Sequence, residues 1–285
     1  MMHVRYKLRE SEKFVVPKGP SFSRGRNICI DIDGTLIRFK TPKHYPYNKN
    51  IGQTLPEKEY QLARMPFISH YDETSKLKDN WKKLSVFKND WAFNGSWLTG
   101  SLAHLSMNFS FVKVVNYEND FSLFHPRAFE KIIGDYLTYQ YSRFTSDSHD
   151  GKHHYIAPVN WNPLSCWQVI AARMDVKLDQ DVMPVGSDVH IMFFPISNDV
   201  IASVQFRPSR ILNITQKELD KRVSKQPMLD LIDEIINSFQ LTLSSEALNA
   251  QKIALAGLDD ASLINDYPPL QWPVGVSNKS TEHLE

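Results

Sequence analysis

Three features of the sequence predict an α+β fold in which antiparallel sheets are each packed by amphipathic helices. Several short segments alternate apolar and polar residues with a period of two, which is typical of strands with one buried face. Two longer segments repeat apolar residues at helical spacing, and each follows a group of strand-like segments. The regular strand–helix alternation of a doubly wound parallel sheet is missing. We therefore expect two halves of similar size, each rich in strands and closed by a helix.

The first half is predicted to begin with a hairpin at residues 27–39. A polar loop follows at 42–58, then a weakly helical stretch at 73–86, and residues 107–115 alternate like a strand. Pro126 opens a helix with one buried face, whose residues at i, i+3 and i+4 spacing are Phe129, Ile132, Ile133, Tyr136, Leu137 and Gln140.

Residues 142–154 are polar and show no periodicity, so we interpret them as a linker or a long loop between domains at 1–141 and 155–285. Because both predicted domains have the same order of elements, each is expected to pack its helix against its own antiparallel sheet.

In the second half, strands are predicted at 167–176, 188–194 and 200–206, and the last two are expected to pair antiparallel. Pro227 then opens an amphipathic helix whose apolar face is formed by Met228, Leu231, Ile232, Ile235 and Phe239. A final helix is expected to end near Gly257, capped by Ser244 or Ser245.

Charge is unevenly distributed along the chain. The net charge is +1, but residues 1–43 hold ten Lys and Arg against four Asp and Glu, whereas 227–285 hold two against nine. No basic helix or aromatic RNA-binding motif accompanies this asymmetry, so it favours a head-to-tail or domain–domain contact, or simply solvated ends, over nucleic-acid binding.

Two cysteines, Cys29 and Cys166, lie far apart in apolar surroundings, and we expect two buried thiols in a reducing compartment. No apolar run is long enough for a membrane helix, and the first ten residues lack the apolar core of a signal peptide. These features predict a cytoplasmic protein, or a periplasmic one if an export signal has been removed.

Residues 27–39 read NICIDIDGTLIRF and resemble the first motif of haloacid-dehalogenase phosphatases. This resemblance implies Asp31 as the nucleophile and Asp33 as the general acid/base, with Mg²⁺ between carboxylate and phosphate. The alternative is a plain hairpin, because isoleucines alternate on one face of the first strand and Asp33-Gly34 is a turn signal. Two prolines soon after the motif exclude the helix that such a phosphatase needs next. We therefore favour the hairpin.

Other functional signals are sparse. His149, His153 and His154 lie close in sequence, but adjacent histidines point to different sides and no carboxylate stands at ligand spacing, so we predict neither a metal site nor a cofactor. Most of the tryptophans are expected in the core. Exposed aromatic and arginine residues in irregular segments are candidates for binding a partner protein, and we select Tyr45, Tyr47, Trp161, Arg207 and Arg210.

Four segments resemble immunity-type proteins encoded beside effectors of bacterial type VI secretion systems: WAFNGSW at 91–97, SLFHPRAFE at 122–130, APVNWNP at 157–163 and LIDEIINSFQLT at 231–242. The last segment also resembles the closing helix and strand of PsbP-like domains. The resemblance implies a protein without catalytic activity that neutralises or escorts a toxic effector by direct contact. The haloacid-dehalogenase phosphatase is the alternative function.

Overall fold

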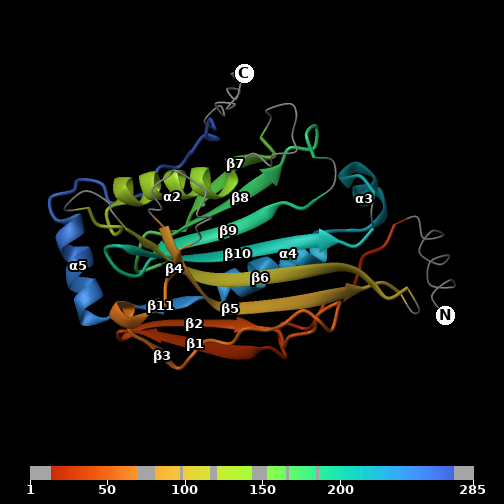
Figure 1. Cartoon of the computed structure of the whole chain (residues 1–285), viewed down its shortest axis with the longest axis horizontal. Helices are drawn as coiled ribbons and strands as arrows, with labels where there is room; N and C mark the ends of the chain where they lie inside the picture. The colour runs from red at the N-terminus through yellow and green to blue at the C-terminus, as the bar shows by residue number, and fades with distance from the viewer. Residues whose placement is uncertain are drawn as a thin grey trace, which may run out of the picture.

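The computed structural model describes residues 14–69, 81–96, 99–115, 121–142, 153–164, 167–183, 186–212 and 214–272 (Figure 1). The described residues form two sheets and a small set of helices, so the predicted α+β class is confirmed.

The larger sheet has seven strands in the order β4-β5-β6-β10-β9-β8-β7, and every neighbouring pair is antiparallel. Its strands are β4 (Ile68–Ser69), β5 (Trp81–Asn94), β6 (Ser101–Val114), β7 (Tyr155–Pro163), β8 (Ala172–Leu178), β9 (Val189–Pro195) and β10 (Val200–Arg210). The predicted pairing of the 188–194 and 200–206 strands is confirmed as the β9–β10 hairpin.

The smaller sheet has the order β11-β2-β1-β3. The antiparallel hairpin of β1 (Arg26–Ile32) and β2 (Thr35–Thr41) is flanked by two short strands, β3 (Glu59–Tyr60), parallel to β1, and β11 (Gln240–Thr242), antiparallel to β2. A 3₁₀ turn follows β3 at Leu62–Arg64. The predicted hairpin at 27–39 is confirmed.

Four α-helices complete the described part of the chain: α2 (Pro126–Tyr141), α3 (Gln216–Arg222), α4 (Gln226–Asn237) and α5 (Ser245–Leu255). The predicted start of α2 is confirmed by Pro126 in its first turn and by the His125 ring, which accepts a hydrogen bond from the Arg127 N–H. Ser244 caps α5, as one of the two predicted alternatives, by accepting from the Ala247 N–H. Helix α3 was not predicted.

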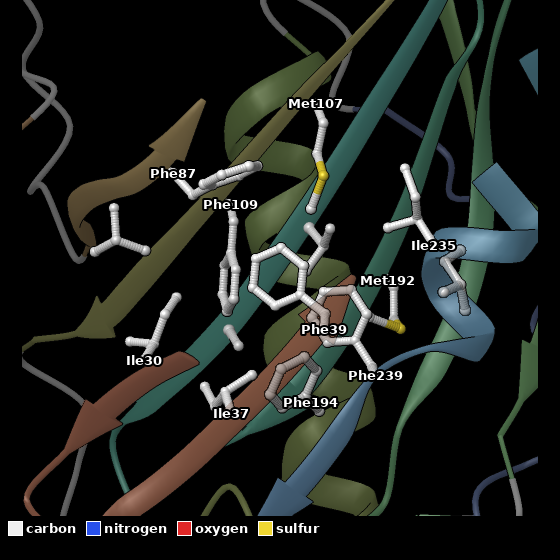
Figure 2. Close-up of a cluster of buried hydrophobic side chains, with 14 of the residues drawn as sticks. Ile30, Ile37, Phe39, Phe87, Met107, Phe109, Met192, Phe194, Ile235 and Phe239 are labelled. Atoms are coloured by element: carbon white, nitrogen blue, oxygen red, sulfur yellow. The ribbon is translucent and has the colours of Figure 1, made fainter. Parts of the chain in front are cut away.

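These elements make three layers. Helix α2 covers one face of the larger sheet, and the smaller sheet with α4 covers the opposite face (Figure 1). Figure 2 shows Phe39 of β2 among the buried side chains between the two sheets. Its ring is stacked on that of Phe239, with ring centroids 4.5 Å apart. Phe87 and Phe109 of the larger sheet meet the same ring edge-on or tilted. The smaller sheet is therefore attached through an aromatic core.

The larger sheet joins the two predicted halves. All eleven residues of β10 pair with β6, and β11 pairs with β2. The predicted division into 1–141 and 155–285 thus does not correspond to a division of either sheet. The reason is that β6 and β10 bury their apolar residues by pairing with each other across the middle of one sheet.

Two predicted elements are corrected. Residues 81–86 belong to β5 rather than to a helix, and residues 73–80 of that prediction lie outside the described residues. The strand predicted at 167–176 begins at Ala172, and β7 was not predicted as a strand. A β-bulge between Ser85 and Phe87 shifts the register of β5, which breaks the period of two within that strand.

Cys29 was expected to be buried but is exposed. Its side chain lies on the face of β1 opposite to Ile28 and Ile30, and that face of the smaller sheet points away from the core. Cys166 lies outside the described residues.

Candidate functional site

Asp31 and Asp33 build the β1–β2 turn. Asp33 and Gly34 both have positive φ, 46° and 82°, as a tight primed turn between antiparallel strands requires. The Oδ1 atom of Asp31 accepts a hydrogen bond from the Gly34 N–H at 2.9 Å, and Oδ2 of Asp33 accepts from the Leu62 N–H at 2.9 Å. Each carboxylate therefore fixes a loop. The phosphatase alternative needs Asp31 at the end of a parallel strand leading to a helix, whereas β1 continues into antiparallel β2.

Tyr45 and Tyr47 both lie on the surface, with exposed fractions of 55% and 42%. The backbone of Tyr45 bonds to the outer edge of β5, through the Asp90 carbonyl and the Ala92 N–H. The ring of Tyr47 packs against His104 of β6, with centroids 4.4 Å apart. His104 in turn bonds through Nδ1 to Asp90 at 3.3 Å. The exposed ring of Tyr47 is thus packed on His104, which is itself held by its bond to Asp90.

Arg207 lies on the same face of the larger sheet as His104. In the register of β10 and β6, Ser209 pairs with His104 and Arg207 pairs with Ser106, and residues two apart on a strand share a face. The structure therefore brings Tyr47 and Arg207, two of the predicted binding residues, to one side of the sheet. These two residues are 160 positions apart in the sequence, so no local pattern indicated that they lie on the same side of the sheet.

Trp161 and Arg210 do not fit the predicted role. The indole N–H of Trp161 donates to the Ile264 carbonyl at 2.7 Å, and its ring packs on Tyr267. The side chain of Arg210 is 6% exposed and binds Asp220 and the Val223 carbonyl. Both side chains hold later parts of the chain in place, because their polar atoms find partners within the fold.

On the side of the larger sheet that α2 covers, the side chains change from apolar to polar where the helix ends. Under α2 its side chains are apolar, as at Ile201 and Val112. Beyond the helix they become polar along three neighbouring strands, and we call this surface the open sheet face; it consists of Lys83, Ser85, Lys88, Ser106, Asn108, Gln205 and Arg207. A cavity of about 480 Å³ lies on it.

Sequence reasoning selected one residue of this face, Arg207. Residues 104, 106, 108 and 110 of β6 are polar at every second position, which was a usable signal for a polar face on that strand. Lys83 and Lys88 of β5 gave no such signal, because the bulge between them places an odd-numbered and an even-numbered residue on the same face.

A second polar cluster lies on the opposite side of the sheet. The Nδ1–H of His190 donates to Asp175 at 2.6 Å, and the Asn160 amide donates to the other carboxylate oxygen at 2.6 Å. Burial by itself raises the pKa of Asp175, but the hydrogen bonds from His190 and Asn160 and the nearby positive charges outweigh it and lower the pKa below its ordinary value. This arrangement orients an imidazole.

Within the described ranges, no three His, Cys, Asp or Glu side chains are grouped as metal ligands. His149, part of the sequence cluster considered above, lies outside those ranges. In the same part of the chain, no helix is long and apolar enough to cross a membrane.

The fold and the open sheet face define an α+β protein with a solvent-facing polar sheet surface. No protein-family model and no curated protein matches the chain. Among solved structures, a mutant of protein Mog1 matches with a TM-score of 0.34 and 8% identity, over 77% of this chain and 98% of that one.

The Saccharomyces cerevisiae Ran-binding protein Mog1p matches with a TM-score of 0.30 and 9% identity, over 78% of this chain and 99% of that one. The Neisseria meningitidis iron-regulated outer membrane lipoprotein FrpD matches with a TM-score of 0.20 and 13% identity, over 80% of this chain and 99% of that one. At these TM-scores and identities, the similarities assign neither a family nor an activity to the chain.

Proposed function

We propose that this chain is a binding protein that neutralises or escorts a toxic effector protein by direct contact, without catalysis of its own. We infer that the partner is an effector because four sequence segments resemble type VI immunity-type proteins. The surface geometry supports binding as the mode of action.

The observation that carries the proposal is the exposed ring of Tyr47, which is fixed on His104 beside the open sheet face. Tyr and Arg side chains supply much of the binding free energy at protein interfaces, and most of all where they are held rigidly with a polar rim around them. All three predicted residues Tyr45, Tyr47 and Arg207 are exposed. The ring of Tyr47 packs on His104, Arg207 hydrogen-bonds to Tyr141, and the backbone of Tyr45 bonds to the edge of β5.

The binding proposal also requires a continuous surface for a partner protein. A stable complex buries about 800 Å² on each partner, roughly 20 to 30 residues a side. The open sheet face spans β5, β6 and β10 and is continued by the loop that carries the two tyrosines, so one partner can cover both.

The test is protection of growth. The product of the gene next to this one is expressed in a bacterial host with and without the chain, and growth is compared. We expect the chain to restore growth and to form a stable complex, and Tyr47→Ala to weaken the complex by about 2 kcal/mol with an unchanged melting temperature.

Ile156→Ala is the matched control, because Ile156 is 41% exposed and lies on β7, at the opposite edge of the sheet from β5. It should leave both complex and growth unchanged. Absence of protection and of any complex would refute the proposal. If Tyr47→Ala weakens the complex no more than Ile156→Ala does, the tyrosines lie outside the interface.

A further inference from the structure

The open sheet face carries a local excess of positive charge. Lys83, Lys88 and Arg207 line the cavity of about 480 Å³, and no carboxylate lines it. Among the described residues, none of these three side chains forms an ion pair. The carboxylate of Asp90 lies on the same face, but it is buried and bonded to His104.

Two of these cations, Lys83 and Arg207, are near enough to affect each other. Burial lowers the pKa of Lys83, and the positive charge of Arg207 lowers it further. Arg207 is positioned by a hydrogen bond to Tyr141, the last residue of α2. Two like charges kept near each other raise the free energy of the unbound protein, and an anion placed between them removes that repulsion.

Neutral donors surround the cations. The Oδ1 atom of Asn108 accepts from the Ser85 hydroxyl at 2.6 Å, which directs the amide nitrogen of Asn108 to other acceptors. Gln205 forms the buried floor, with its amide nitrogen 3.3 Å from the Ser203 hydroxyl that accepts from it. Oxyanions are bound in proteins by such a combination of cations and amide or hydroxyl donors.

The lining favours a side chain from another protein over a small molecule. Pockets for small molecules are lined mainly by apolar and aromatic groups that enclose the ligand. Here Met107 is the one apolar residue of the lining, and Ser85, Lys88 and Arg207 are exposed. An exposed, polar and cationic hollow is typical of the charged part of a protein interface.

We propose that this cavity, which we call the basic pocket, receives carboxylate side chains from an acidic segment of the partner protein. The inference rests on the proposed function, because it identifies the chemistry of the partner at the same surface. Complementary charge at this position sets the orientation of the partner and accelerates association.

The test uses the full chain and a fluorescent peptide of six glutamates as the probe. We expect Lys88→Gln combined with Arg207→Gln to weaken binding of the peptide about tenfold, and binding to weaken further at high ionic strength. The matched control combines Lys177→Gln and Lys217→Gln, which removes the same charge from exposed positions outside the pocket and should change the affinity less than about twofold.

Equal binding by the pocket variant and the control variant, or no binding of the peptide, overturns the proposal. If inorganic phosphate saturates the site and displaces the peptide, the ligand of the pocket is a small anion instead. Self-association of the chain that disappears in the pocket variant would identify a second copy as the occupant. Melting temperatures of all variants are compared, and Lys88→Glu alone serves if Arg207→Gln loses its fold through the contact with Tyr141.

The two proposals fail in different ways. If Tyr47→Ala abolishes protection from the effector while the pocket variant protects fully, the binding function stands and the acidic segment is refuted. If the peptide binds as expected but the chain protects from no effector, the pocket stands and the proposed function is refuted.

Discussion

At the residue scale, single positions in this protein are set by backbone conformation and by hydrogen bonds between side chains. Gly34 has a φ of +82°, a region that residues with a Cβ rarely adopt. Gly52 is not in that region, and a Cβ there would meet nothing within 4 Å. Two glycines in neighbouring loops therefore differ in whether the fold requires them.

We predict that Gly34→Ala lowers the free energy of unfolding by about 1 to 2 kcal/mol, because a Cβ is strained at this φ. The space itself is adequate, since the nearest atom to an added Cβ is the Ser244 Cβ at 3.5 Å. Gly52→Ala should change stability by less than about 0.5 kcal/mol. Urea unfolding measures both, and equal effects would mean that the turn tolerates other conformations.

Asp175 gives a prediction about pH. Its pKa is lower in the folded state than in the unfolded state, because hydrogen bonds and positive charges outweigh the effect of burial. The stabilisation that its carboxylate provides is therefore complete above the unfolded pKa of about 3.9 and is lost as the pH falls through the folded value. Asp175→Asn should be less stable than the wild type at about pH 5, and the difference should shrink toward about pH 3.

Chemical unfolding at the two pH values checks this expectation. In a His190→Gln background, where the hydrogen bond from the imidazole is lost, the effect of Asp175→Asn should depend less on pH. The same pH dependence of this difference in both backgrounds would contradict the role given to His190.

At the element scale, amphipathic patterns decide how helices pack. The predicted apolar face of α4 is buried, with Ile232 and Ile235 fully inaccessible, and Asp230, Asp233 and Glu234 are exposed. The helix lies against β2 and β10, so it connects the two sheets. Proline in its first turn supports the start of the helix without a side-chain cap.

We predict that Ile235→Ala lowers the free energy of unfolding by about 2 to 5 kcal/mol, through lost burial and the cavity that remains. Glu234→Ala, one position away on the exposed face, should change it by less than about 0.5 kcal/mol. Thermal and urea unfolding measure both values. Equal sensitivity at the two positions would mean that α4 is enclosed on all sides.

At the scale of the whole molecule, the pairing of β6 with β10 joins the two predicted halves of the chain in one sheet. Strand β6 comes from residues before the predicted linker and β10 from residues after it, and they form the middle of the larger sheet. Trp161 bonds to Ile264, and Trp272 bonds to the Tyr155 carbonyl, so the segment after α5 is attached to β7.

We predict that fragments 1–141 and 155–285 do not fold separately, because each would expose an unpaired, largely apolar central strand. Circular dichroism and hydrogen exchange of the isolated fragments should show little protection, and mixing or co-expressing them should restore it in part. A stable, protected fragment on its own would support the division into two domains.

The sequence by itself determined the elements whose signals are local. The Asp33-Gly34 turn, the capped start of α2 and the apolar stripe of α4 each depend on residues within a few positions of one another. Tertiary structure decided the rest. It paired β6 with β10, buried Arg210 against Asp220, and placed Tyr47 on His104 beside Arg207.

The physical reason is that strand pairing across long stretches of sequence depends on the total apolar area buried by the whole fold, which no local pattern specifies. The bulge in β5 shows that a local pattern can also fail to predict which residues share a face within one strand. By changing which residues share a face, it assembled the basic pocket from Lys83 and Lys88, whose spacing in the sequence indicates opposite faces.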